Sequence, residues 1–164
     1  MPKIKVVLDT SILISALKSK DSKRSPSVKI LGLLKEDRLV NYGSKETLQE
    51  MKETLAVIGL LTGKTQKARA IYNLLLNNTV KVSPRVRFEE DKKLVKGVGH
   101  EEDVKFLNVV YSAKARYLVS MNTKHLVKLR DPRTLKFSLK RHWFYILKDS
   151  ELLKHLREKY KWKV

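Results

Sequence analysis

The sequence predicts an α/β protein with a three-layer α/β/α architecture and a mostly parallel central sheet of about five strands. Short apolar runs rich in β-branched residues alternate along the chain with segments whose apolar residues recur at helical spacing. The strand runs are apolar on both faces, which is typical of strands buried between two layers of helices. Because helices separate successive strands, we expect crossover connections and parallel pairing. The length of 164 residues favours a single domain over residues 1–164.

The predicted elements follow from local patterns. Residues 4–8 (Ile-Lys-Val-Val-Leu) are typical of a buried strand, and residues 11–17 carry the apolar spacing of a short helix. Ser25 followed by Pro26 predicts an N-cap and the first residue of the next helix. The other strands are predicted at residues 38–42, 79–83, 117–120 and 143–147. The other helices are predicted to begin near residues 44, 65, 101 and 149, with a turn and a short helix at 121–128.

One polar segment interrupts this alternation. Residues 85–99 are polar and basic, and Gly97 and Gly99 lie near the end of the segment. Such a composition is typical of a connection without regular structure, so the sequence predicts a mobile loop here.

The chain is strongly basic, with 36 Lys and Arg residues against 17 Asp and Glu residues and a formal net charge of +19. This charge destabilises a compact protein by self-repulsion and attracts polyanions, so nucleic acid is the first candidate partner. A lysine-rich solubilising surface is the alternative, but such surfaces usually balance lysine with glutamate. The C-terminal residues 159–164 interleave bases with aromatics, a pattern that suits nucleic-acid contact and is equally typical of a frayed amphipathic end.

Several classes of protein are excluded by composition. Cysteine is absent, which excludes disulfides, thiolate zinc sites and a cysteine nucleophile. No apolar run reaches the roughly 18 residues needed to cross a bilayer, and the first residues lack the features of a signal peptide. We therefore expect a soluble, cytoplasmic protein without membrane contact.

The acidic residues are few, so their positions are informative. Asp9 directly follows the first predicted strand, at the edge of the sheet where parallel strands place functional groups. Its carboxylate could bind a hard cation or cap the following helix, and the sequence leaves both open. Asn122 follows the strand at 117–120 in the same way, and its amide oxygen could bind a cation or close an Asx turn.

Two further acids lie on predicted helices. Glu50 borders the apolar stripe of its helix, although a solvated helix flank is the simpler explanation for Glu46, Glu50 and Glu53. Asp103 shares a helix face with Leu107, where a carboxylate is costly unless it is paired or bound to a metal. Together with Asp9 and Asn122, these side chains would form an oxygen-only ligand set that suits Mg²⁺ or Mn²⁺.

Four segments of the sequence resemble the motifs of PIN-domain ribonucleases, in particular of the archaeal and bacterial toxins of toxin–antitoxin pairs. They are residues 6–17, 44–51, 102–107 and 117–126. The resemblance covers residues 4–128 in the order of the family, and it implies the PIN-like three-layer fold. Residues 129–164 match less well and are interpreted as a C-terminal elaboration of the same domain.

The resemblance implies a role for each matching polar residue. Asp9, Glu50 and Asp103 correspond to the catalytic acids of the family. Asp9 and Asp103 would hold Mg²⁺ or Mn²⁺, and Glu50 would complete the outer coordination or take the proton. Asn122 stands where the family has a fourth acid, so it would position water as a neutral ligand. The missing charge weakens the case for a second metal ion.

Supporting roles fall to hydroxyl and basic residues. Thr10 and Ser120 match hydroxyls that would orient the ligands. The basic residues expected to bind the RNA backbone are Lys92, Lys93, Lys96, Lys124, Arg130 and Arg133.

The function implied is metal-dependent hydrolysis of RNA phosphodiester bonds. As a toxin, the protein would form a homodimer and pair with a small antitoxin protein. The alternative is a catalytically weak or inactive PIN-like module that binds RNA or the ribosome. A phosphoryl-transfer enzyme of the haloacid-dehalogenase type is disfavoured, because Ser11 stands where that class needs a second aspartate.

Overall fold

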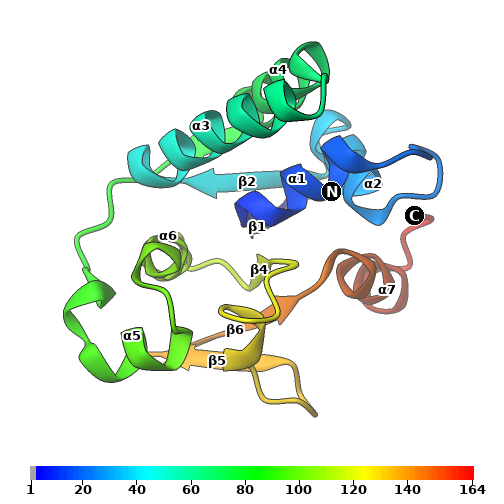
Figure 1. Cartoon of the computed structure of the whole chain (residues 1–164). Helices are drawn as coiled ribbons and strands as arrows, with labels where there is room; N and C mark the ends of the chain where they lie inside the picture. The colour runs from blue at the N-terminus through cyan, green and yellow to red at the C-terminus, as the bar shows by residue number, and fades with distance from the viewer. Residues whose placement is uncertain (1–2) are drawn as a thin grey trace.

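A six-stranded sheet forms the centre of the molecule, with the strands in the order β3-β2-β1-β4-β6-β5 (Figure 1). The structure, a computed structural model, describes residues 3–164. All neighbouring strands pair in parallel except β5, which is antiparallel to β6. The strands are β1 Ile4–Leu8, β2 Leu39–Gly43, β3 Thr79–Lys81, β4 Tyr117–Val119, β5 Lys136–Leu139 and β6 His142–Leu147. The predicted three-layer α/β/α fold with a mostly parallel sheet is confirmed.

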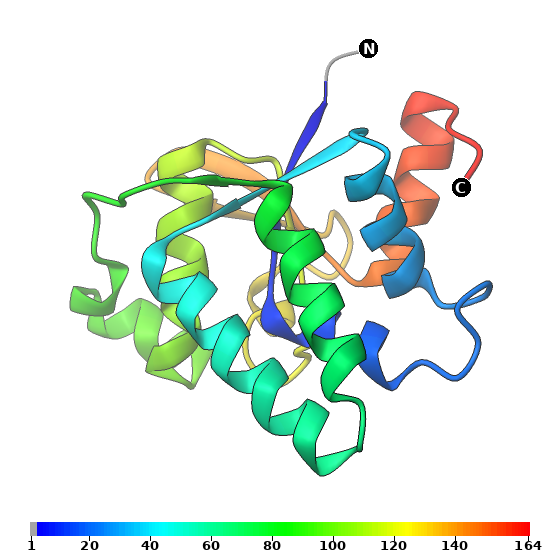
Figure 2. The same ribbon diagram turned by 90° about the horizontal axis from the view of Figure 1, so that it is seen from above.

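Helices cover both faces of the sheet. Seen from above, α2 and α7 lie on one side of β1 and α6 lies on the other (Figure 2). The helices α3 and α4 pack against each other as an antiparallel pair. The α-helices are α1 Thr10–Lys18, α2 Pro26–Lys35, α3 Lys45–Leu61, α4 Thr65–Asn77, α5 Lys92–Val98, α6 Val104–Ala113 and α7 Asp149–Tyr160. Across residues 3–164, none of the helices combines the length and apolarity needed to cross a bilayer.

The prediction of a mobile loop at residues 85–99 is wrong. A 3₁₀ turn at Phe88–Glu90 and the helix α5 occupy most of this segment, and Val98 is buried. The Asp91 side chain accepts a hydrogen bond from the Leu94 N–H and so caps α5. Gly99 follows the helix with a φ of 83°, which makes this glycine a helix terminator. The polar, basic composition that predicted a loop is also that of this short, lysine-rich helix, so composition alone could not distinguish the two.

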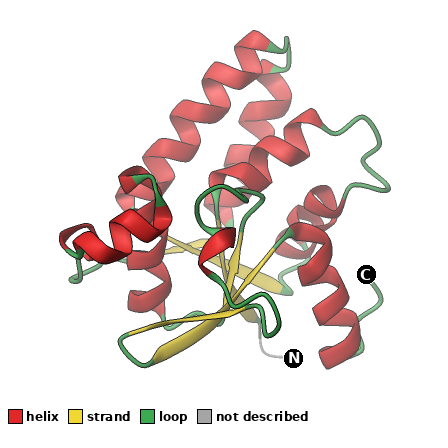
Figure 3. Cartoon of the chain, turned by 60° about the horizontal axis from the view of Figure 1, so that its bottom comes forward, coloured by secondary structure: helices red, strands yellow, loops and turns green. Residues whose placement is uncertain are grey.

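The sixth strand, β5, was not predicted. It forms a hairpin with β6 (Figure 3). Phe137 packs edge-on against Phe144 with the ring centroids 6.0 Å apart, within the range typical of such pairs. The turn consists of Lys140 and Arg141, which have φ values of 45° and 70°. Hairpin turns with two positive φ angles usually contain Asn or Gly, so two basic residues gave no hairpin signal.

Two helix starts also differ from expectation. Residues 101–103 form a 3₁₀ turn, and α6 begins only at Val104. The sequence also predicts Asp149 as the N-cap of the last helix, but Asp149 is the first residue of α7, and its carboxylate accepts a hydrogen bond from Ser27 Oγ at 2.7 Å. The Lys148 N–H is satisfied by Glu151 Oε1 at 2.8 Å. Asp149 therefore links α7 to α2 through its side chain instead of capping the N-terminus of α7.

Candidate active site

The parallel pairing of β1 with β4 brings Asp9 beside Ser120. Leu8 lies opposite Val119 in the register, so the residues that follow leave the sheet side by side. The Asp9 N–H donates to the Val119 carbonyl at 2.9 Å, which extends the ladder by one residue. This is the carboxyl edge of the sheet, where open α/β folds place their functional groups.

The Asp9 carboxylate is buried, with 4% of the residue exposed. Its Oδ2 accepts hydrogen bonds from Ser11 Oγ and Ser120 Oγ, each at 2.7 Å. Asp9 occupies the N-cap position of α1, but its side chain makes no capping hydrogen bond. Of the two roles that the sequence left open for Asp9, helix capping is therefore wrong.

The three predicted acids lie close to one another. The pKa of Asp9 is raised to about 6, mainly by burial; the negative charges of Asp103 and Glu50 also raise it, whereas the hydrogen bonds from the two serine hydroxyls lower it. Such repulsion between carboxylates operates only over short distances. Acids from the β1–α1 junction, from α3 and from the turn before α6 thus share one site.

Glu50 is positioned by two side chains from other elements. Thr10 Oγ1 donates to Glu50 Oε2, and Lys105 Nζ lies 2.9 Å from Glu50 Oε1. Lys105 is largely buried, with 15% of its side chain exposed, and it also pairs with Glu102 at 3.3 Å. The sequence analysis did not identify Lys105 as part of the site. The only sequence feature that points to it is its spacing of three residues from Glu102, because residues three apart on a helix are neighbours.

Asp103 is half-buried at the end of the 3₁₀ turn. Asn122 Nδ2 donates to Asp103 Oδ2 at 3.3 Å, and His100 Nδ1 lies 3.9 Å from the same oxygen. Burial raises the pKa of Asp103, whereas His100 and His125 nearby act to lower it. The structure therefore brings Asn122 to the acids, with its amide nitrogen rather than its oxygen directed at Asp103.

Two serines hold the loop after β4 against the start of α1. Ser11 Oγ accepts from the Met121 N–H at 2.9 Å, and Ser120 Oγ accepts from the Asn122 N–H at 3.0 Å. Both hydroxyls donate to Asp9, so each fixes the carboxylate and the loop together. Ser120 was predicted to have a supporting role. Ser11 has an equivalent one that the sequence did not reveal.

The residues fit a magnesium-like cation in their donor chemistry, without forming a closed cage. Within residues 3–164, no three His, Asp or Glu side chains are arranged as a ready metal-binding group. Mg²⁺ usually retains several waters and binds proteins through one or two carboxylates, so a three-acid cage is not required. Both serine hydrogen bonds to Asp9 end on Oδ2, so they leave Oδ1 available to a cation. Asp9 and Asp103 are the residues that could hold such an ion.

The basic residues expected to bind RNA fall into two groups. Lys92, Lys93 and Lys96 are exposed on α5, which contacts the turn that carries Asp103. Lys124 and Arg133 are also exposed. These exposed side chains could bind a polyanion.

Arg130 is placed differently. Its guanidinium donates to Glu151 Oε1 at 2.7 Å and to Glu151 Oε2 at 3.1 Å, and it also donates to the Ile146 carbonyl. Only 13% of its side chain is exposed. This internal pairing argues against the predicted RNA contact and assigns Arg130 to joining the 3₁₀ turn at Val127–Leu129 with β6 and α7.

Two comparisons with known proteins bear on these residues. The PIN domain family profile matches residues 5–124, which include all three acids and Asn122. An uncharacterised protein of Methanocaldococcus jannaschii is 33% identical over 131 residues, covering 79% of this chain and 77% of its own length. The elements β5, β6 and α7 lie beyond the residues that the profile matches.

Proposed function

The chain belongs to the PIN domain family, and from this premise we propose that it is a divalent-metal-dependent endoribonuclease centred on Asp9, Glu50 and Asp103. The observation that carries this proposal is the clustering of three carboxylates, which helps to raise the pKa of Asp9 to about 6. A site that concentrates negative charge in this way is suited to a cation. The toxin role, an antitoxin partner and a cytoplasmic location remain predictions from the resemblance.

Asp9 and Asp103 would hold the ion, with Asn122 beside them. When bound, Mg²⁺ or Mn²⁺ would lower the pKa of water and neutralise the oxygens of the phosphate. Ser11 and Ser120 keep the Asp9 carboxylate in one orientation, because both donate to the same oxygen. Preorganisation of this kind avoids the cost of ordering the carboxylate during the reaction.

Both carboxylate oxygens of Glu50 accept hydrogen bonds, one from Thr10 and one from Lys105. Thr10 and Lys105 thus hold the Glu50 carboxylate in one orientation, and each oxygen keeps a lone pair that can accept a proton or a hydrogen bond from water. The arrangement suits both roles that the resemblance implies for Glu50, completing the outer coordination of the ion and taking the proton. The Lys105 ammonium group adds a positive charge that can meet a phosphate oxygen.

The net charge of +19 supports a polyanionic substrate. The exposed lysines of α5 lie next to the acidic turn and would bind the backbone on either side of the cleaved bond. RNA is the nucleic acid that the resemblance to PIN-domain ribonucleases implies.

The test is cleavage of single-stranded RNA with and without Mn²⁺. We expect Asp9→Asn and Asp103→Asn to reduce the rate by at least about a hundredfold, because each removes a charge that would hold the ion. The control is Lys35→Gln, a change at the last residue of α2, purified in the same way. It should cleave RNA at the wild-type rate. Equal cleavage by wild type and Asp9→Asn would show that a contaminating nuclease does the cutting.

A module that binds RNA without cutting it is the second candidate. Asn122 in place of an acid and the Lys105–Glu50 ion pair both reduce the negative charge of the site, which favours this alternative. RNA binding by the wild type with no Mn²⁺-dependent cleavage would support the module and reject the nuclease.

A further inference from the structure

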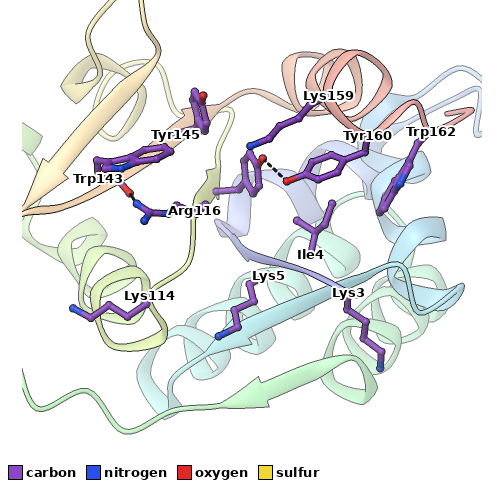
Figure 4. Close-up of a pocket in the computed structure, with 11 residues that line it drawn as sticks. Lys3, Ile4, Lys5, Lys114, Arg116, Trp143, Tyr145, Lys159, Tyr160 and Trp162 are labelled. Carbon is purple, nitrogen blue, oxygen red and sulfur yellow. Dashed lines mark hydrogen bonds between the residues drawn. The ribbon is translucent and has the colours of Figure 1, made fainter. Parts of the chain in front are cut away.

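A cavity lies at the amino edge of the sheet, at the opposite end of the strands from the acids. It has a volume of about 430 Å³ and lies where β1, β4 and β6 begin and α7 ends. Figure 4 shows Trp143 and Arg116 at one end of it and Tyr160 and Trp162 at the other. Lys5 is four residues before Asp9 on an extended strand, so about 13 Å of β1 separates the two sites. The cavity is therefore not an extension of the acidic centre.

The cavity is lined by positive charge. Its cations are Lys3, Lys5, Lys114, Arg116 and Lys159, and no Asp or Glu is among the residues that line it. Lys3 pairs with Asp37 at 2.8 Å. In residues 3–164 the other four cations form no ion pair with an acid. Arg116 donates to the Trp143 carbonyl, but no acid in the described part of the chain neutralises any of the four, so the positive charge around the cavity favours an anionic ligand.

Aromatic rings accompany these charges. Trp143 in β6 and Tyr160 at the end of α7 are each 36% exposed. The guanidinium of Arg116 lies 4.0 Å from the centre of the Trp143 ring, and Tyr160 Oη is hydrogen-bonded to Tyr117 Oη at 3.3 Å. Exposed rings beside unpaired cations are the combination with which proteins stack bases and hold phosphates of single strands.

Trp162 supplies an independent observation. It lines the cavity and is 5% exposed, yet its Nε1–H has no acceptor. Within the part of the chain that the structure describes, this is the one buried side-chain nitrogen or oxygen without a hydrogen-bond partner. Buried donors nearly always have an acceptor, and a ligand could supply the one that is missing here.

We propose that this cavity binds a segment of single-stranded nucleic acid, stacking a base against Tyr160 and holding phosphates with Lys5, Arg116 and Lys159. Binding here needs no metal ion and no cleavage, so it goes beyond the proposed ribonuclease reaction and does not depend on it. A protein with both sites would hold one part of a strand at the amino edge while the acids act at the carboxyl edge.

Tryptophan fluorescence reports directly on this cavity, because Trp143 and Trp162 are the two tryptophans of the chain and both line it. A hexamer of uridine is titrated into the full chain in EDTA, which prevents metal-dependent cleavage, and tryptophan fluorescence is recorded. Saturable quenching is expected. Lys5→Gln combined with Lys159→Gln should weaken the apparent affinity about tenfold, because two phosphate contacts are lost.

Matched variants separate stacking from general charge. Lys20→Gln with Lys23→Gln removes the same charge from the exposed loop between α1 and α2, and it should change the affinity less than threefold. Tyr160→Phe keeps the ring and should bind like the wild type, whereas Tyr160→Ala should bind about tenfold more weakly. Circular dichroism of each variant confirms that it is folded.

Three results would overturn the proposal. They are the absence of quenching at millimolar RNA, equal weakening by the two lysine pairs, and quenching by inorganic polyphosphate with the same affinity as by RNA. None of these outcomes bears on cleavage at Asp9, so the failure of this proposal and that of the ribonuclease can be told apart.

Discussion

The Asp9 carboxylate lies in an environment that opposes its own charge. Burial removes its water, and Glu50 and Asp103 repel it, while two serine hydroxyls compensate in part. The folded pKa of about 6 exceeds the ordinary aspartate value of 3.8, so between these values the folded state binds more protons than the unfolded state. Stability therefore falls as the pH rises through this window, and the ionised carboxylate destabilises the metal-free protein above it.

Asp9→Asn is accordingly expected to raise the melting temperature of the protein in EDTA at pH 7. The pKa shift sets an upper limit of about 3 kcal/mol for this gain, and the altered hydrogen bonds with Ser11 and Ser120 reduce it. The gain should shrink as the pH falls from 6 towards 4, because the wild-type carboxyl then takes up its proton. Thermal unfolding followed by circular dichroism over this pH range measures it.

Mn²⁺ provides the control for this prediction. The ion should raise the melting temperature of the wild type, because it binds the folded carboxylates, and it should raise that of Asp9→Asn much less. A lower melting temperature for Asp9→Asn at every pH, in EDTA, would contradict the picture of a destabilising charge.

A side-chain ion pair and a hydrogen bond hold α7 against its neighbouring elements. The pair formed by Arg130 and Glu151 joins the 3₁₀ turn at Val127–Leu129 to α7, and the Ser27–Asp149 hydrogen bond joins α7 to α2. Burial acts to raise the pKa of Glu151, but the hydrogen bonds from Arg130 and the Lys148 N–H outweigh it, so the pKa lies below 4.5. The C-terminal helix is thus anchored by charge as well as by its apolar face.

Glu151→Gln is expected to lower the melting temperature at pH 7. The folded pKa of Glu151 is depressed, so its contribution to stability is present above pH 4.5 and is lost as the pH falls through the folded pKa. The difference in melting temperature between wild type and variant should therefore narrow below pH 4.5. Glu158→Gln, an exposed change on the same helix, serves as the control and should have little effect at either pH. A difference that stays constant from pH 7 to pH 3.5 would show that the charge of Glu151 is not the stabilising feature.

The whole molecule separates its charges. The site acids Asp9, Glu50 and Asp103 lie together at the carboxyl edge of the sheet, whereas the chain as a whole carries an excess of basic residues. An exposed apolar patch adds a third surface at the end of α3, where Val57, Leu60 and Leu61 are 57%, 76% and 79% exposed. Apolar side chains exposed together in this way are typical of a contact surface.

The homodimer predicted from the resemblance is expected to use this patch. Leu60→Lys combined with Leu61→Lys should convert a dimer into a monomer, because it places two charges in the contact. Light scattering after size-exclusion chromatography measures the mass, with Val80→Lys on β3 as a control change of another exposed apolar residue. A wild type that is monomeric at about 100 μM would contradict the prediction.

Much of the fold could be predicted because it follows from local periodicity. The β-branched run at Ile4–Leu8 and the Ser25-Pro26 start of α2 are confirmed at the expected places. The errors fall where local composition misleads. A lysine-rich helix at Lys92–Val98 has the composition of a loop, and the turn at Lys140 and Arg141 lacks the usual glycine or asparagine.

In the candidate site, too, some features follow from neighbouring residues in the sequence and others depend on contacts between distant residues. By itself the sequence determined the α/β architecture and the place of Asp9 at the end of a buried strand, because both depend on neighbouring residues. Only the tertiary structure decided that Asp9 is held by Ser120, that Lys105 pairs with Glu50 and that Arg130 is bound to Glu151. These partners are separated by 21 to 111 positions along the chain. Contacts at such separations arise from how crossover helices pack on the sheet, which no local pattern of residues encodes.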